Sequence, residues 1–264
     1  MLEKMTKILK ENTGLDFGFC PFFAVSENLI DCAAKNRLPK NSKTIISFVF
    51  PYKCKENAPL NISRYAAVSD YHNVVKNKLE RIKQILQNEF KDSSFECFVD
   101  NSPIPEVRAA AYCGLGIIGK NNLLITKKWG SNVFLSEIIT DIDIKIHPTN
   151  LIYCENCGKC AEICPTGRLK NKENPCLSDI TQKKKLTDLE MELIKNQKSV
   201  WGCDLCQECC PLNMGTKTTE IKEFLEDYRD FYKPDEDNKN RAYNWRGEKI
   251  IKRNYELVSK SKQS

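Results

Sequence analysis

The sequence predicts an α+β protein whose parts follow one another: an N-terminal α/β domain over residues 1–150, a small cysteine-rich domain over 151–215 and a short helical tail over 216–264. Three observations support this division. Strand-like and helix-like patterns alternate before residue 150. Nine of the 14 cysteines lie between Cys154 and Cys210. Beyond Pro211 the chain is charged and helical in pattern, and its total of 264 residues suits one ordinary domain and one small one.

The first predicted elements are a short amphipathic helix and a buried strand. Residues 2–12 alternate charged and apolar residues at helical spacing, and we expect this helix to end near Gly14. Residues 44–50 are rich in β-branched and aromatic side chains and stop at Pro51, which predicts a buried strand. Residues 53–62 show little periodicity and predict a loop.

A long helix and a second strand follow. Residues 69–90 place their apolar side chains at helical spacing, with a serine and an aspartate available as N-cap. A strand is predicted at 94–99 and a turn at 100–103. Pro105 suits the first turn of a helix over 106–113, which Gly114 would end.

The segment 114–122 carries three glycines and a lysine between that helix and a strand at 123–126. A nucleotide-binding loop needs the order strand, loop, helix, so the segment predicts either a plain turn or a backbone approached closely by a large flat group. A further strand is predicted at 133–140, and 141–150 links it to the cysteine-rich domain.

The cysteines follow the spacing of bacterial ferredoxins, in which three closely spaced thiolates bind one 4Fe-4S cluster and a fourth binds a second cluster. The runs read Cys154-x2-Cys157-x2-Cys160-x3-Cys164-Pro165, then Cys176, then Cys203-x2-Cys206-x3-Cys210-Pro211. This predicts a ferredoxin-like double-cluster domain and a one-electron relay. We assign one cluster to Cys154, Cys157, Cys160 and Cys210, and the other to Cys164, Cys176, Cys203 and Cys206. Cys209 is left over, because only Cys210 stands directly before a proline.

Zinc and disulfides explain these cysteines less well. Structural zinc usually takes two separated pairs of ligands, and a disulfide framework would imply a secreted chain. No charged and then apolar segment with a cleavage site opens the sequence. No apolar run approaches the ~20 residues of a spanning helix. We therefore expect a soluble, cytoplasmic protein that does not interact with membranes.

The charge balance suits a polyanionic partner without requiring one. Lys and Arg number 41 and Asp and Glu 35, a formal net charge of +6. The basic segment from Trp245 to Asn254 has two interpretations: it contacts phosphate, or it belongs to a solvated terminal helix.

Several strings of the chain occur in the same order in one known family. They are Ser63-Arg64-Tyr65-Ala66, Asp70-Tyr71-His72, Val99-Asp100-Asn101-Ser102-Pro103 with Glu106, Gly114-Leu115-Gly116-x-x-Gly119-Lys120-Asn121, Gly130-Ser131-x-x-Phe134-Leu135, and Gly202-Cys203-Asp204-x-Cys206-Gln207 with Cys210-Pro211-x-Asn213. With the cysteine frame, they resemble epoxyqueuosine reductases from about residue 15 to 213.

The resemblance implies a cobalamin-dependent oxidoreductase with two 4Fe-4S clusters, which removes the epoxide oxygen of epoxyqueuosine in tRNA and so completes queuosine biosynthesis. The corrinoid would lie base-off in the N-terminal domain, and no Asp-x-His-x-x-Gly motif for a histidine-ligated corrinoid is present. Asp100 would be the general acid that protonates the leaving oxygen. The corrinoid-binding residues would be Ser63, Arg64, Asp100, Lys120, Asn121, Leu124, Leu135 and Asp204. The three glycines of segment 114–122 would be small because the macrocycle approaches them.

The chain departs from typical members in two places. It compresses an N-terminal segment into residues 28–43, and it stops soon after Asn254, before the helical-repeat domain that helps typical members grip tRNA. Two other functions therefore stay open: a related corrinoid reductase of a small-molecule electrophile, and a ferredoxin-type electron-transfer protein without catalysis. In each case we expect a monomer that takes electrons from a donor the sequence does not identify.

Overall fold

The computed structural model describes residues 1–56 and 60–260, and its contacts divide the chain into two compact units. Both helices and strands are present, so the mixed fold class is confirmed. The units interleave in sequence, whereas the predicted domains 1–150, 151–215 and 216–264 follow one another; that finer arrangement stays a prediction. Unit 1 comprises Met1–Phe50, His72–Lys127 and Val133–Glu155, and unit 2 comprises Pro51–Tyr71, Lys128–Asn132 and Asn156–Ser264.

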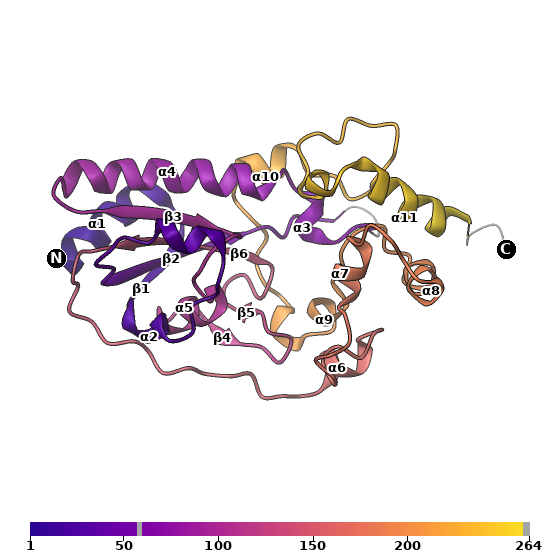
Figure 1. Ribbon diagram of the computed structural model, residues 1–264, viewed down its shortest axis with the longest axis horizontal. Coiled ribbons are helices and arrows are strands. Elements are labelled where there is room, and N and C mark those ends of the chain that lie inside the picture. Colours follow the sequence, from indigo (N-terminus) through magenta and orange to yellow (C-terminus); the bar gives the residue numbers. More distant parts are fainter. Residues whose placement is uncertain (57–59, 261–264) are drawn as a thin grey trace. The chain divides into compact units, whose positions relative to one another are not determined.

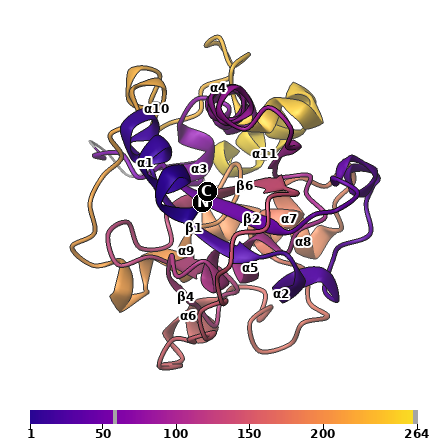
Figure 2. The same ribbon diagram turned by 90° about the vertical axis from the view of Figure 1, so that its left-hand side faces the viewer.

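Unit 1 is built on a four-stranded sheet in the order β1-β2-β6-β3, in which β1 pairs antiparallel with β2 and β3 pairs antiparallel with β6. Helices α1 and α4 lie on one face, and α2 and α5 lie on the other (Figures 1 and 2). All eight residues of β2 are buried, as the sequence predicted. The bounds are α1 Leu2–Thr13, β1 Asp16–Pro21, α2 Phe23–Ser26, β2 Thr44–Pro51, α4 Tyr71–Glu89, β3 Phe95–Val99, α5 Glu106–Tyr112 and β6 Val133–Thr140.

Three smaller elements complete unit 1. A 3-10 helix spans Ala33–Arg37, and a two-stranded antiparallel hairpin pairs β4 (Ile117–Ile118) with β5 (Leu124–Ile125). The hairpin occupies the glycine-rich segment that the sequence predicted as a turn followed by a strand. Its first strand was not predicted.

Strand β1 was also not predicted. It contains Gly18, which weakens a strand-like pattern because glycine has no side chain to pack. The structure explains this glycine, since a Cβ there would lie 2.2 Å from the carbonyl oxygen of Cys113. Close packing between α5 and the sheet therefore decides the residue, and that information is absent from the local sequence.

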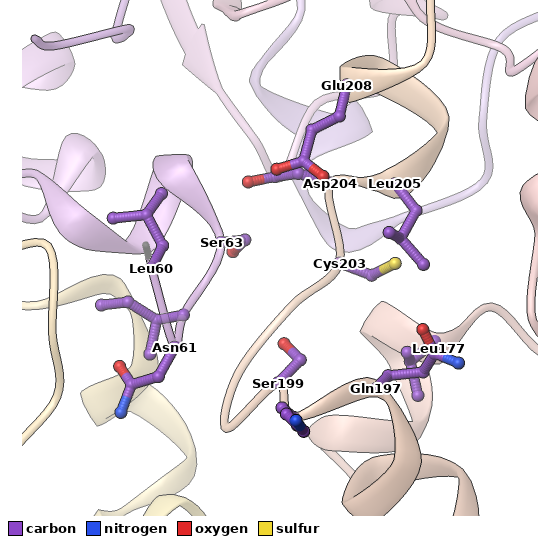
Figure 3. Close-up of a pocket in the computed structure, with 12 residues that line it drawn as sticks. Leu60, Asn61, Ser63, Leu177, Gln197, Ser199, Cys203, Asp204, Leu205 and Glu208 are labelled. Carbon is purple, nitrogen blue, oxygen red and sulfur yellow. The ribbon is translucent and has the colours of Figure 1, made fainter. Parts of the chain in front are cut away.

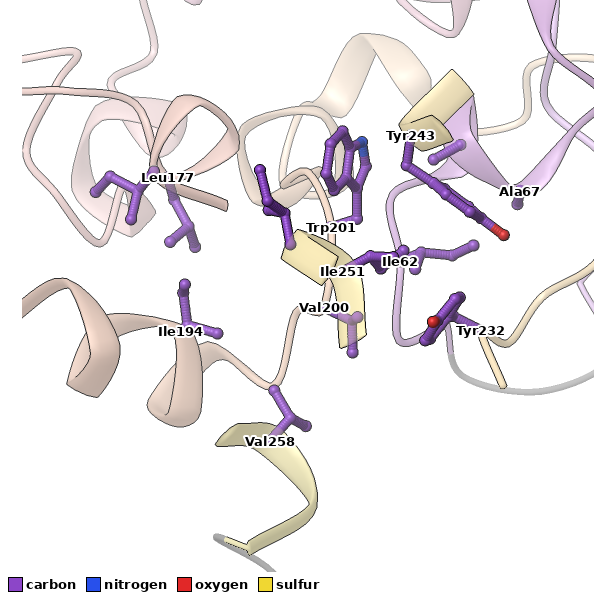
Figure 4. Close-up of a cluster of buried hydrophobic side chains, with 13 residues drawn as sticks. Ile62, Ala67, Leu177, Ile194, Val200, Trp201, Tyr232, Tyr243, Ile251 and Val258 are labelled. Atoms are coloured by element: carbon purple, nitrogen blue, oxygen red, sulfur yellow. The ribbon is translucent and has the colours of Figure 1, made fainter. Parts of the chain in front are cut away.

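Unit 2 consists of short helices around one apolar core centred on Trp201 (Figure 4). Trp201 is fully buried and packs edge-on against Tyr243, at 6.0 Å between ring centroids. The bounds are α3 Arg64–Ala67, α6 Lys159–Ile163, α7 Leu177–Thr181, α8 Asp188–Gln197, α9 Leu205–Glu208, α10 Lys222–Glu226 and α11 Glu248–Lys260, with 3-10 helices at Pro211–Asn213 and Ala242–Arg246.

The C-terminal helix α11 corrects the interpretation of a solvated terminal helix. Ile250, Ile251, Asn254 and Val258 are buried, and the Asn254 side-chain amide donates hydrogen bonds to the carbonyl oxygens of Thr181 and Val200, at 2.8 and 2.9 Å. The charged residues that suggested a solvated helix occupy its other face. Residues 57–59 of the predicted loop and 261–264 of the predicted tail lie outside the described residues. Among the helices that are described, none combines the length and apolar character needed to span a bilayer.

Candidate functional site

Unit 2 brings together three of the cysteines predicted to share a cluster. Burial raises the pKa of the Cys203 thiol to about 12, and the neighbouring thiols of Cys176 and Cys164 add to this rise. Cys203 precedes α9, Cys176 precedes α7 and Cys164 follows α6, so three separate helix ends supply them. Thiolate sulfur is the donor that a 4Fe-4S cluster takes. These three thiols are the donors predicted for one cluster, and their role as ligands stays a prediction.

Cys209 lies beside predicted ligands of the other cluster. Burial raises its pKa first, and then the thiols of Cys160, Cys210 and Cys157 contribute. Helices α6 and α9 are in contact and carry these cysteines or lead into them. The choice of Cys210 over Cys209 as a ligand stays a prediction, because both thiols lie in this group.

A hydrogen-bond network explains the polar residues around the last three cysteines. The Asn213 side chain accepts a bond from the Ser131 backbone at 2.7 Å and donates to the Ser131 hydroxyl and to the Gln207 carbonyl. The Gln207 side chain in turn accepts from the Ser131 hydroxyl at 3.0 Å and donates to Asp204 at 3.1 Å. Gly130 must be small, since a Cβ there would lie 2.2 Å from Asn213 Oδ1. The network holds the segment from Asp204 to Asn213, which carries predicted ligands, in one conformation.

Two predicted corrinoid contacts, Arg64 and Asp204, bind each other. The Arg64 backbone N–H donates to Asp204 Oδ2 at 2.6 Å, and the guanidinium pairs with Glu208 at 2.9 Å and with Glu56. Burial raises the pKa of Asp204 to about 6, and the bonds and charge from Arg64 oppose that rise. Only 6% of the Asp204 side chain is exposed. These interactions give both residues a structural role within unit 2.

Ser63, also a predicted corrinoid contact, lines a pocket that Cys203 lines too (Figure 3). Its hydroxyl is buried and lies beside the hydroxyl of Tyr65. Gly202 approaches it so closely that a Cβ would lie 2.0 Å from Ser63 Oγ. Gly202 also has a φ of +75°, so substitution there would cause both a clash and backbone strain.

In unit 1, Asp100 occupies a strained turn between β3 and α5. Its φ of +58° lies in the left-handed region, which aspartate and asparagine tolerate better than most residues. Its carboxylate oxygen Oδ2 lies 3.3 Å from Nε2 of His72, and 58% of its side chain is exposed. Asp100 does not cap α5, because Pro105 holds the N-cap position. The turn instead presents an acid to solvent.

The remaining predicted contacts lie on or beside the β4–β5 hairpin of unit 1. Leu124 is buried in a small apolar cluster against which Leu135 packs. The Asn121 side chain accepts a bond from the Leu123 backbone at 3.4 Å. The side chain of Lys120 is exposed, and its backbone N–H donates to the Cys154 sulfur at 3.3 Å. That bond links the hairpin directly to a predicted cluster ligand.

The glycines of this segment are small for reasons internal to the hairpin. A Cβ on Gly116 would lie 2.5 Å from the Ile125 carbonyl oxygen, and one on Gly119 would lie 2.3 Å from Asn121 Oδ1. Gly114 has a φ of +75°. Packing of the chain against itself therefore accounts for these residues without a bound macrocycle.

Sequence analysis missed Glu137, which is fully buried in the middle of β6. The available signal was a lone charged residue in a predicted strand that is otherwise apolar or uncharged. Gln207 and Asn213 occur in the sequence strings that resemble the family, but the sequence predicted no role for them. Their bonds to Ser131 connect positions more than 70 residues apart, which no local pattern reveals.

The sheet unit together with the grouped thiols defines an iron–sulfur protein of the double-cluster class. Residues 153–213 match the family model "4Fe-4S double cluster binding domain". Residues 33–101 match the model "Epoxyqueuosine reductase QueG, DUF1730". The chain belongs to the epoxyqueuosine reductase family.

Curated relatives support this membership. An epoxyqueuosine reductase of Lactococcus garvieae is 33% identical over 243 residues, which cover 81% of this chain and 68% of the relative. That of Cyclobacterium marinum is 34% identical over 199 residues, covering 72% of this chain and 64% of the relative. The chain therefore spans less than two thirds of the length of the Cyclobacterium relative.

Solved structures show the same fold. An epoxyqueuosine reductase crystallised with an epoxyqueuosine-modified tRNA stem loop aligns with a TM-score of 0.79 and 25% identity, over 97% of this chain and 80% of that one. The epoxyqueuosine reductase of Streptococcus thermophilus aligns with a TM-score of 0.79 and 24% identity, over 100% of this chain and 82% of the other.

Proposed function

We propose that this chain is a cobalamin-dependent iron–sulfur reductase that converts epoxyqueuosine to queuosine in tRNA. The observation that carries the proposal is one chain combining the double-cluster cysteine frame with an exposed acid, Asp100, in the family's Val99-Asp100-Asn101-Ser102-Pro103 turn. The first feature delivers electrons one at a time, and the second offers a proton. Reductive removal of an epoxide oxygen requires both.

The residues present are compatible with a corrinoid. The edge of a corrin carries amide groups, which need hydrogen-bond partners when buried. Within unit 1, the hydroxyl of Ser136 is buried without a partner among the described residues. Lys120, Asn121 and Leu135 of the same unit would complete the contacts of the corrinoid. When bound, the corrinoid supplies low-potential electrons to an electrophilic carbon.

Asp100 supplies the proton chemistry in this proposal. Opening an epoxide generates an alkoxide, and a carboxylic acid at that position neutralises it as it forms. The left-handed backbone of Asp100 and the contact with His72 Nε2 fix the direction of the carboxyl group. The fixed turn therefore holds the acid ready, at no further ordering cost when substrate arrives.

The substrate is the part of the proposal that needs the most direct test, because the Cyclobacterium relative is matched over only 64% of its length. A small-molecule electrophile would use the same electrons and the same acid. A pure electron-transfer protein would need neither corrinoid nor acid.

The test begins with protein purified without oxygen and with its clusters reconstituted. Cobalamin is added in steps and visible absorbance is followed. We expect a saturable spectral change, and its absence would rule out both corrinoid enzymes. Turnover is then compared for epoxyqueuosine tRNA and for the free nucleoside. Turnover of tRNA supports the proposal, whereas an enzyme that binds cobalamin but converts neither substrate points to another electrophile.

A further inference from the structure

Unit 1 contains two buried carboxyl groups that the proposed function leaves unused. Glu137 lies in the middle of β6 and is fully buried. Glu106 is the first residue of α5 and follows the Asp100 turn. Oε1 of Glu106 is buried without a hydrogen-bond partner in the described part of the chain, and Glu137 is fully buried with the Ser102 hydroxyl beside it. An ionised carboxylate in such surroundings is unfavourable, because no cation among the described residues compensates its lost hydration.

The surroundings of Glu137 are apolar. It stands opposite Phe98 of β3, and cross-strand partners share a face of the sheet. Ile139, two residues along β6, shares that face too. Phe98 and Ile139 pack with Ala109 of α5 in one apolar cluster. Glu137 therefore points toward the helix that Glu106 begins.

The two glutamates and Asp100 are electrostatically connected. Burial raises the pKa of Glu106 to about 8, with Asp100 as the next cause, while the Asp100 backbone hydrogen-bonds the Glu106 carboxyl and opposes the rise. Burial, and then Glu106, raise the pKa of Glu137 well above its usual range. The carboxyl groups thus form a series from the core, Glu137, through Glu106, to the exposed Asp100.

The other titratable groups that face this series are thiols and an imidazole. Cys20 of β1 and Cys113 at the end of α5 face Glu137, and His72 of α4 faces Asp100. Burial raises the pKa of Cys113 well above its usual range, so that thiol stays neutral. No cation is among the causes that shift the two glutamates, within residues that the structure describes. Holding protons is therefore the available way for this site to avoid buried charge.

We propose that Glu106 and Glu137 form a protonated carboxyl pair that resupplies Asp100 with a proton after Asp100 has protonated the leaving oxygen. This inference rests on the proposed function. Converting an epoxide to an alkene breaks two C–O bonds, forms one C=C bond, consumes two electrons and two protons, and releases water. A low-potential iron–sulfur donor supplies the electrons. Asp100 holds one proton, and the pair supplies the second.

The roles of the two glutamates differ. Glu106 also accepts a hydrogen bond from the Asp100 backbone, so it positions the turn as well as passing the proton. Glu137 lies beside the Ser102 hydroxyl of the turn, and it serves as the reserve because it is the more deeply buried of the two carboxyl groups. After turnover the pair regains its proton from water through the exposed Asp100.

The first measurement needs no turnover. Infrared spectra of the holoprotein, native and with Glu137→Gln or Glu106→Gln, are compared at neutral pH. Glutamine has the shape of a protonated glutamate but carries no titrating proton, so both variants should fold. We expect a protonated carboxyl band in the native spectrum that each substitution weakens. If neither substitution weakens the protonated carboxyl band seen in the native protein, the proposal is overturned.

The second measurement is the pH profile of epoxyqueuosine tRNA turnover. The native rate should fall as pH rises past about 8, where Glu106 loses its proton. Each glutamine variant should turn over roughly tenfold or more slowly, and Glu106→Gln should also lose this alkaline fall. Glu80→Gln, at a partly exposed position of α4, is the matched control and should keep the native profile. A merely structural role would lower the rate without changing the profile's shape, and that result would overturn the relay.

The two proposals fail in different ways. Native protein that converts tRNA, with glutamine variants that do so equally well, overturns the carboxyl relay and leaves the proposed function intact. Native protein that binds cobalamin but converts no epoxyqueuosine substrate overturns the proposed function, and with it the destination of the proton.

Discussion

At the scale of single residues, Asp100 shows how backbone and side chain serve one purpose. A φ of +58° is costly for most residues, and aspartate tolerates it because its short polar side chain can bond locally. The exposed carboxyl then faces solvent beside His72, which is where an approaching substrate can meet it. The strain is therefore consistent with a functional turn rather than a packing requirement.

Asp100→Asn tests this residue with little disturbance of the backbone, because asparagine also tolerates the left-handed region. We expect turnover to fall by about 10²- to 10⁴-fold, the usual contribution of a general acid. Iron content and cobalamin binding should not change. Asp92→Asn, at an exposed position after α4, is the control. Unchanged turnover in Asp100→Asn would remove the acid role.

At the scale of elements, the segment from Asp204 to Asn213 owes its conformation to side chains rather than to helix propensity. Helix α9 has only four residues and no side-chain cap. Such a short helix is not stable alone. Asn213 instead fixes the segment through three hydrogen bonds to Ser131 and Gln207. The predicted ligands Cys206 and Cys210 lie inside this stretch.

Asn213→Ala should therefore loosen a cluster. It leaves the buried Ser131 N–H without its partner, at a cost of about 1–3 kcal/mol, and removes one of the hydrogen bonds to the Gln207 carbonyl. We expect faster loss of iron during exposure to a chelator, followed by visible absorbance. Asn171→Ala, in an exposed turn between the cysteine runs, is the control. Equal rates of iron loss in both variants would mean that the network does not support the cluster.

Helix α11 permits a separate test of its buried face. Ile251 is 1% exposed, and removing its side chain leaves a cavity in the core around Trp201. Ile251→Ala should lower the free energy of unfolding by about 2–4 kcal/mol. Lys252→Ala, one position along, removes a partly exposed ion pair with Glu248 and should change that free energy by less than about 0.5 kcal/mol. Thermal unfolding followed by circular dichroism measures both, and similar melting temperatures would contradict a packed helix.

Elements were predictable wherever local pattern and tertiary role agree. The strand Val133–Thr140 was predicted with its observed bounds. Three of the four cysteines predicted for one cluster are neighbours in unit 2, and their role as ligands stays a prediction. Strand β1 was missed because contact with Cys113 demands Gly18. The burial of α11 was missed because its charges suggested solvent. The pairing of Arg64 with Asp204, 140 residues apart, is a tertiary fact that the local sequence could not predict.

At the scale of the whole molecule, charge bears on the substrate. The net charge of +6 is modest, yet it has the sign that attracts a polyanion. Phosphate contacts release counterions, so affinity for nucleic acid falls steeply as salt rises. A free nucleoside carries no phosphate, so its binding releases no counterions. The two substrates should therefore respond differently to salt.

We expect kcat/KM for epoxyqueuosine tRNA to fall roughly tenfold or more between about 50 and 200 mM salt, while kcat/KM for the free nucleoside changes less than about twofold. Sucrose at matched osmolality controls for solvent effects and should leave both values unchanged. The clusters and the acid serve both reactions equally, so any difference arises from binding of the polyanion. A parallel fall for both substrates would place the salt effect in electron delivery or the chemical step. A flat response for both would mean that this chain does not hold tRNA through its phosphates.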